Sequence, residues 1–150
     1  MAVDFSAILS KQTSDIKKPK PKPVGTYLCN NPQLPKFQGA GKNEHPVAVF
    51  GLVILAPQDD VDAEELGAYQ TEFGEIRGKT LRHTHWLNSD GAMNHSKEEL
   101  VNAWGIEEEG KSLGQMYNET INRQVLVTIK HRPSEDGTDM FEEIEKLAAV

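Results

Sequence analysis

The amino-acid sequence predicts a single, mainly β domain with one or two short helices. Runs of β-branched and aromatic residues recur along the chain, clusters of Gly, Pro and Asn separate them, and one short segment, from Ser96, has a helix-capping pattern. The 150 residues are enough for one domain with one hydrophobic core. The longest apolar run, Val47 to Ala56, is too short to span a membrane, so we expect a soluble protein without a membrane partner.

Residues 1–22 are expected to form a flexible, Lys/Pro-rich N-terminal arm ahead of a domain that covers residues 23–150. The segment from Ile16 to Pro23 alternates proline with lysine, and proline lacks a backbone donor and disfavours helix in the residue before it. An extended, polyproline-like linker is therefore predicted. Its lysines either contact phosphates or only keep the linker soluble. The arm lacks a basic region followed by an apolar core, so no secretion signal is expected.

The first three predicted strands cover residues 24–30, 46–55 and 79–87. The second strand is apolar on both faces, which favours a central position in the sheet. Turn formers are abundant between the first two strands. Residues 58–78 are predicted to be an acidic insertion, a long surface loop with one helical turn near residues 63–68.

Two helices and two further strands complete the prediction. Ser96 and Glu99 match a capping box at the start of a helix, and Gly105 would end it after an apolar stripe formed by Leu100, Val101 and Trp104. Residues 112–119 predict a second short helix. The fourth strand covers residues 123–131, with its inward side chains at Val125, Val127 and Ile129.

The C-terminal segment predicts a hairpin. The sequence Pro133-Ser-Glu-Asp-Gly137 is typical of a tight turn, because glycine supplies a position with positive φ. A fifth strand over residues 139–145 is expected to follow and to become helical near Lys146. The alternative is a helix throughout, because Phe141, Ile144 and Leu147 have helical spacing.

This order of elements, with the helix between strands 3 and 4, is that of the oligonucleotide-binding (OB) fold, a five-stranded Greek-key barrel. We therefore predict a five-stranded, OB-fold-like β-barrel. The same order is compatible with an SH3-like or another small barrel.

Charge alone argues against binding to nucleic acid. The net charge is −7 and the isoelectric point is near 5.2, whereas phosphate binding requires clustered Lys and Arg. The charges are unevenly distributed, however, because basic residues gather in segments that are separate from the acidic ones. A basic groove can coexist with a negative net charge, since the nearest charges dominate the local electrostatic field. The alternative is that the basic side chains are only solvated.

The sequence does not predict an enzyme. It has no Gly-x-Ser-x-Gly nucleophile motif and no Gly-x-x-x-x-Gly-Lys-Ser/Thr phosphate-binding motif. The single cysteine, Cys29, fits a reducing cytoplasm and is expected to be a small buried side chain. His83 and His85 face the same side of a strand, a geometry that can bind zinc with further ligands from Cys29, His45, His95 or His131. No metal-binding spacing supports this, so no metal and no cofactor are predicted.

The other face of the third strand predicts nucleic-acid binding. Arg82 and Trp86 share that face, and they combine a cation for phosphates with a ring on which a base can stack. Phe37 and Tyr27 are further candidate stacking rings, and the predicted groove is extended by Lys36, Phe37, Lys42, Lys79, Lys130 and Arg132. The alternative is that Trp86 belongs to the core and Arg82 caps the edge of the barrel.

Two segments carry a resemblance to a known family. One is Lys22-Pro-Val-Gly-Thr-Tyr-Leu-Cys followed by Gly41-Lys-Asn, and the other is Gln124-Val-Leu-Val-Thr-Ile-Lys-His followed by Glu135-Asp-Gly-Thr. They are similar to a bacteriophage family of small proteins that look like phage single-stranded DNA-binding proteins of the OB-fold type. The resemblance covers residues 23–147. This chain departs from the family in its acidic insertion and its Lys/Pro arm, and it lacks a clear acidic tail that ends in Phe.

Two functions from different classes follow. The resemblance implies binding of single-stranded DNA without sequence preference, in the host cytoplasm, beside phage or host proteins of DNA replication and recombination. The negative net charge favours the alternative, a protein–protein interaction module that acts on a host or phage factor through its acidic loops. The sequence leaves open whether the protein is a monomer or a homo-oligomer.

Overall fold

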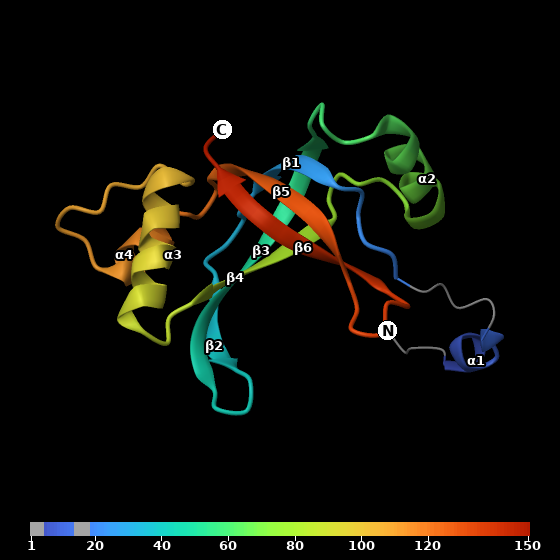
Figure 1. The fold of residues 1–150 in the computed structure, drawn as a ribbon, viewed down its shortest axis with the longest axis horizontal. Helices are drawn as coiled ribbons and strands as arrows, with labels where there is room; N and C mark the ends of the chain where they lie inside the picture. The colour runs from blue at the N-terminus through green and yellow to red at the C-terminus, as the bar shows by residue number, and fades with distance from the viewer. Residues whose placement is uncertain (1–4, 14–18) are drawn as a thin grey trace.

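The computed structural model describes residues 5–13 and 19–150, which contain one antiparallel sheet and four short helices (Figure 1). The strands are β1 (Gly25–Asn30), β2 (Lys36–Ala40), β3 (His45–Pro57), β4 (Thr80–Trp86), β5 (Gln124–Pro133) and β6 (Met140–Ala148). The helices are α1 (Phe5–Leu9), α2 (Ala63–Phe73), α3 (Asp90–Asn102) and α4 (Leu113–Asn118). All five predicted strands are present, and β2 is an additional strand within a segment that the sequence predicted to be loop.

Strand β3 organises the sheet because it is long enough, at 13 residues, to pair with three other strands. Its first half pairs with β2 and its second half with β1 on the same edge, while β4 pairs along the opposite edge. The sheet continues from β1 to β5 and then to β6, and every pairing is antiparallel. The central position predicted for the apolar strand is confirmed.

The sheet curls around one hydrophobic core. Phe50, Leu52 and Ile54 from β3 belong to the same buried cluster as Val127 and Ile129 from β5, and Figure 1 shows the β5–β6 hairpin crossing over β3 and β4. Burial of these apolar surfaces is the main force that holds the two ends of the sheet together. Within the described residues no strand pairing joins β4 to β6, so the sheet is not closed and the predicted barrel is not confirmed.

Helix α3 starts earlier than the sequence predicted. Its N-cap is Ser89, whose side chain accepts a hydrogen bond from the backbone N–H of Ala92, so the prediction of Ser96 as the cap is wrong. Ser96 is instead buried, and its hydroxyl donates to the carbonyl oxygen of Trp86. The apolar stripe packs as predicted, because Leu100 and Trp104 are buried in the core. The second short helix is confirmed as α4, with a capping box between Ser112 and Gln115.

The acidic insertion is more ordered than predicted. Residues 63–73 form the whole of α2, whose N-cap Asp62 accepts a hydrogen bond from the backbone N–H of Glu65. The cap and the acidic first turn both favour a helix N-terminus, since they satisfy free donors and complement the helix dipole. No residue of α2 is fully buried, although Leu66 and Tyr69 pack against the core.

The C-terminal hairpin is confirmed, and β6 runs to Ala148. The helical turn predicted near Lys146 is wrong, because Lys146 and Leu147 pair with Thr128 and Val127 in the sheet. Backbone hydrogen bonds to β5 therefore outweigh the helical spacing of the apolar residues.

Part of the predicted arm, residues 1–4 and 14–18, lies outside the described residues. In the described part, Lys20 forms an ion pair with Glu72 of α2, and Lys22 forms one with Glu142 of β6. These two lysines contact acidic side chains of the domain. Among the described helices, none combines the length and the apolar character needed to cross a bilayer.

Candidate functional site

Strand β4 separates two very different surfaces. Side chains alternate along a strand, so Leu81, His83 and His85 lie on the inner face toward α3 and the core, whereas Arg82 and Trp86 lie on the outer face. The inner side chains are buried or half-buried, and the outer two are exposed. The sequence predicted which residues share a face but left open whether the face of Trp86 points inward.

The outer face extends over β3 and β2. Trp86 lies directly opposite Val47, which lies opposite Gln38, and Lys36 lies opposite Val49. Because directly paired residues of antiparallel strands share one face, Lys36 belongs to the same surface as Arg82 and Trp86. We call these three residues the outer-face cluster.

A shallow groove runs between two members of the outer-face cluster. Lys36 and Arg82 both line a cavity of about 280 Å³, together with Leu34 and Thr80. Arg82 lies opposite Gly51, and a side chain at Gly51 would meet no atom within 4 Å. The space beside the guanidinium is therefore open to a ligand.

Trp86 is 46% exposed at the end of β4. Its ring makes one edge contact with the ring of His45, at 6.3 Å between centroids. The alternative interpretation of Trp86 as a core residue is wrong. An exposed indole on a face that also carries cations can stack on a flat group of an anionic ligand.

The structure does not bring all the predicted binding residues to this surface. Lys130 and Arg132 lie on β5, opposite Glu143 and Phe141 of β6, and Arg132 forms an ion pair with Glu143 at 3.6 Å. Three steps across the sheet, from β4 through β3 and β1 to β5, separate these two residues from Arg82.

Three other predicted residues lie around the edges of the surface. Lys42 is exposed in the turn between β2 and β3. Lys79 precedes β4, and its ammonium lies 6.0 Å from the ring centroid of Tyr69. Phe37 pairs with buried Ala48 and touches the ring of Tyr117, so it points to the inner face.

Two residues of β1 are removed from solvent. The ring of Tyr27 is completely buried and its hydroxyl donates to the carbonyl oxygen of Pro23, so its interpretation as a stacking ring is wrong. Cys29 is also completely buried, as predicted. Burial raises the pKa of its thiol to about 12, so the thiol stays protonated and unreactive at neutral pH.

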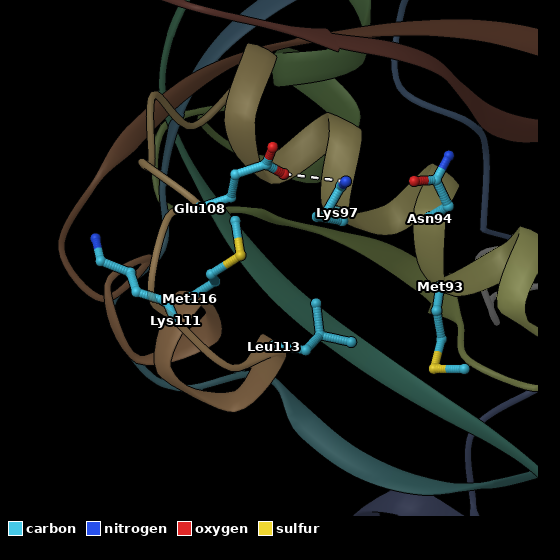
Figure 2. A pocket seen from close by; sticks show the side chains of 7 residues that line it. All are labelled: Met93, Asn94, Lys97, Glu108, Lys111, Leu113 and Met116. Carbon is cyan, nitrogen blue, oxygen red and sulfur yellow. Dashed lines mark ion pairs between the residues drawn. The ribbon is translucent and has the colours of Figure 1, made fainter.

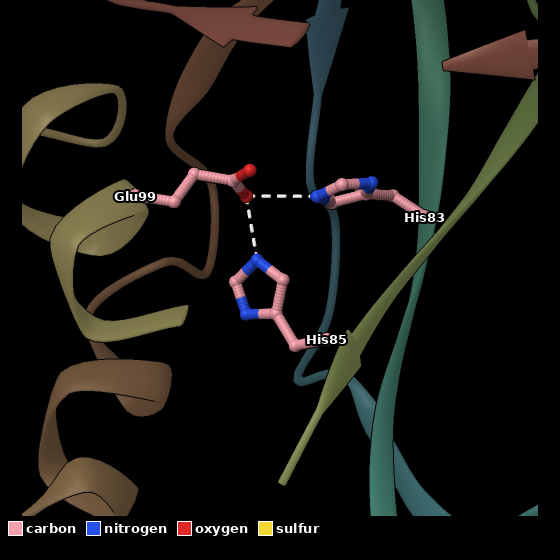
Figure 3. Close-up of side chains that lie close together, drawn as sticks. All are labelled: His83, His85 and Glu99. Carbon is pink, nitrogen blue, oxygen red and sulfur yellow. Dashed lines mark hydrogen bonds and ion pairs between the residues drawn. The ribbon is translucent and has the colours of Figure 1, made fainter. Parts of the chain in front are cut away.

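The inner face of β4 holds a cluster of three polar side chains, which we call the His–Glu cluster (Figure 3). Glu99 of α3 reaches across to β4, and one of its carboxylate oxygens, Oε1, lies 2.8 Å from Nε2 of His83 and 2.5 Å from Nε2 of His85. On its other side, Nδ1 of His85 lies 2.9 Å from the hydroxyl of Tyr117. The carboxylate therefore bridges two imidazoles.

Burial and hydrogen bonding decide the charges in the His–Glu cluster. Burial opposes ionisation of Glu99, but the hydrogen bonds from His83 and His85 outweigh it and hold the pKa of the carboxyl at about 2. Burial lowers the pKa of His85 below its usual value, and the attraction of Glu99 only partly compensates. At neutral pH the cluster is thus an ionised carboxylate that accepts from a neutral His85.

Sequence reasoning found two of the three residues of the His–Glu cluster. The spacing of His83 and His85 predicted that they share a face, and they do. Glu99 was missed as their partner because the Ser96-x-x-Glu99 pattern had been assigned to helix capping. The available signal was that Glu99 precedes the buried Leu100, which places it at the border of the core-facing side of α3.

Another cavity lies between α3 and the segment around α4, with a volume of about 500 Å³ (Figure 2). Its apolar lining comes from Met93, Leu113 and Met116. Lys97 and Glu108, which also line it, form an ion pair at 3.0 Å, drawn as the dashed line in Figure 2. This cavity contains no imidazole or thiol and its rim charges are paired, so it offers less for chemistry than either face of β4.

Comparison of the sequence with protein-family models and with curated proteins finds no match.

Proposed function

We propose that this protein binds single-stranded DNA without sequence preference, through the outer-face cluster of β2, β3 and β4. The resemblance to phage single-strand binders leads us to assign this activity to phage DNA replication or recombination. The observation that carries the proposal is the common outward face of Arg82, Trp86 and Lys36. Cations that follow a backbone beside a ring on which bases stack are what sequence-independent single-strand binding requires.

The local charge supports the proposal despite the net charge of −7. Strands β2, β3 and β4 contain Lys36 and Arg82 but no Asp or Glu. Among the described residues, neither cation has a carboxylate within ion-pair distance, whereas Lys20, Lys22 and Arg132 do. A phosphate at the outer face would therefore meet unpaired positive charge, and the acidic side chains lie on other elements.

The strand pairings support an open OB-type sheet. If β1 and β2 are counted as one interrupted first strand, then β3, β4, β5 and β6 follow as strands two to five, with α3 and α4 between strands three and four. In OB folds the face of strands two and three binds oligonucleotides, and this is the face that carries Arg82 and Trp86.

The test is a fluorescence-anisotropy titration of a labelled oligo-dT with the full chain at low salt, repeated over a salt series. We expect saturable binding that weakens steeply with salt, because bound cations release counterions from phosphates. Arg82→Ala should weaken binding and flatten the salt dependence. The matched control is Arg132→Ala, since Arg132 is an exposed arginine on β5 that already pairs with Glu143. No binding at low salt, or equal losses in the two variants, would refute the proposal.

A protein–protein module is the second candidate, and α2 is the observation that favours it. The helix carries Glu64 and Glu65 in its first turn and has no fully buried residue, so it presents an acidic surface. Pull-down of a partner that survives nuclease treatment and is lost on neutralising Glu64 and Glu65, with no oligo-dT binding, would support this function instead.

A further inference from the structure

We propose that His83, His85 and Glu99 form a binding site for one divalent first-row transition metal ion, and that zinc is the ion it favours. The site lies on the inner face of β4, so it is separate from the outer-face cluster and does not depend on DNA binding. Two imidazoles and one carboxylate are a donor set that zinc accepts, with a further position left for water or another ligand.

The donor atoms are already gathered. One ligand atom from each residue lies within 4.8 Å of the other two, and Nε2 of both histidines faces the same carboxylate oxygen of Glu99. Tetrahedral zinc with bonds of ~2.0–2.1 Å holds its ligand atoms ~3.3 Å apart. The distances of 2.8 and 2.5 Å therefore need to open by less than ~1 Å, and a separation of up to 4.8 Å among the ligand atoms needs to close by at most ~1.5 Å. Glu99 can supply the first movement, because its side chain has rotatable bonds and is partly exposed, and small rotations of the histidine rings supply the second.

A second layer orients the site. The Tyr117 hydroxyl lies 2.9 Å from Nδ1 of His85, and it can donate to this nitrogen without metal or accept from Nδ1–H when Nε2 holds a metal. The His85 ring also packs edge-on against Phe50, at 5.0 Å between centroids. Metal-binding histidines typically have such a partner on the other ring nitrogen, because it fixes the tautomer and the ring plane.

The site is accessible. His83, His85 and Glu99 line a cavity of about 390 Å³, which Ser96 also lines. His95 lines the same cavity from α3, one helical turn before Glu99. A metal ion therefore has an entry path and room for an exchangeable ligand, and both are features of open zinc sites.

The charge of the site favours a cation. Within the described part of the chain, Glu99 has ion-pair contacts to the two histidines and to no Lys or Arg. A negative carboxylate in a half-buried site attracts a divalent ion, and each imidazole binds such an ion through Nε2 as the tautomer that carries its proton on Nδ1. The competing interpretation is a purely structural hydrogen-bond bridge, and the experiment below separates the two.

The experiment uses the full chain after removal of metal with EDTA. Titration with Zn²⁺ by calorimetry should give one ion per chain, and Co²⁺ should give visible absorption bands that saturate at the same ratio. The key variant is His83→Gln, because glutamine can still donate a hydrogen bond to Glu99 but is a poor zinc ligand. We expect it to keep the melting temperature of the metal-free protein and to weaken Zn²⁺ binding at least tenfold, the size of loss that follows perturbation of a metal site.

The matched control is His45→Gln, which removes a histidine from the far side of β3 and should leave Zn²⁺ affinity unchanged. Glu99→Gln is a second variant and should abolish the Co²⁺ bands. Zn²⁺ should also raise the melting temperature of the wild-type protein but not that of His83→Gln, because an ion that binds only the folded state stabilises it. No saturable Zn²⁺ binding by the wild-type chain, or equal affinity in His83→Gln and His45→Gln, would overturn the proposal.

Discussion

The two faces of β4 use polar residues in opposite ways. On the inner face, His83 and His85 share one carboxylate and are enclosed by α3 and the core. On the outer face, Arg82 and Trp86 are exposed and make few contacts. Burial accounts for the difference, because a buried polar group is costly unless it is paired, whereas an exposed one is satisfied by water.

This comparison shows where each kind of function can lie. The inner face is preorganised, since its donors are held by packing and by each other, and such a site suits a small ion. The outer face keeps its cation and its ring free, and such a surface suits a long, flexible polyanion. Substitutions of the packed apolar residues on the inner side should therefore change stability, and substitutions of the exposed residues on the outer face should change DNA binding.

The largest effect is expected from Phe50 on the inner side. Its ring stacks on Trp104 at 5.2 Å and also contacts His85 and Tyr117, so it supports both the core and the His–Glu cluster. Phe50→Ala should lower the free energy of unfolding by about 3–5 kcal/mol, as measured by urea denaturation. Thr84→Ala on the outer face should change it by less than about 1 kcal/mol. Similar losses of unfolding free energy in the two variants would show that the inner and outer sides do not differ in their contribution to stability.

Acid should destabilise the metal-free protein through the inner face. The unfolded chain protonates His85 near pH 6.5 while the folded chain resists, so stability falls as the pH drops below that value. Glu99 has a pKa near 4.5 when unfolded and about 2 when folded, so its contribution, on the order of 3 kcal/mol, is present above pH 4.5 and is lost toward pH 2.

Urea denaturation of the metal-free chain between pH 7 and 3 measures this dependence. His83 contacts the same carboxylate, and His95 lines the same cavity. Glu99→Gln should flatten the part below pH 4.5, because it removes the titrating carboxyl. If the free energy of unfolding of the wild-type chain did not fall as the pH is lowered, the assignment of charges in the His–Glu cluster would be wrong.

The two tryptophans offer a matched pair for the outer face. Trp86 is 46% exposed and Trp104 is 3% exposed, and the chain has no other tryptophan. Binding of oligo-dT should quench the intrinsic fluorescence, because bases stack on Trp86, and the quenching should disappear in Trp86→Phe. Replacement of a good stacking ring by Ala should cost about 1–3 kcal/mol of binding. If the quenching persists in Trp86→Phe but disappears in Trp104→Phe, the binding surface lies on the inner side instead.

The sequence predicts features that depend on neighbouring residues better than features that depend on contacts between distant segments. The alternation of β4 and β5 is local, and it correctly predicted which side chains share a face, although it gave the inward face only for β5. Glu99 was misassigned because capping depends on where a helix starts, and Ser89, seven residues before Ser96, provides the cap. The extra strand β2 could not be predicted, because Lys36 and Phe37 form a strand only by pairing with β3. Whether the sheet closes into a barrel likewise depends on contacts between strands that are far apart in the sequence, so the open sheet could not be predicted either.

Neighbouring residues on β2 give the smallest and sharpest test. Lys36 points to the outer face, whereas Phe37 points inward and touches Tyr117 edge-on at 5.4 Å although it is 50% exposed. Phe37→Ala should therefore leave oligo-dT affinity unchanged and cost about 1 kcal/mol of stability, the value of an aromatic edge contact. Lys36→Ala should do the reverse, because it removes one phosphate contact without changing the core. The opposite outcome is that Phe37→Ala weakens oligo-dT binding and leaves the melting temperature unchanged. Both faces of β2 would then contribute to the DNA site, and the claim that only the outer face binds DNA would be wrong.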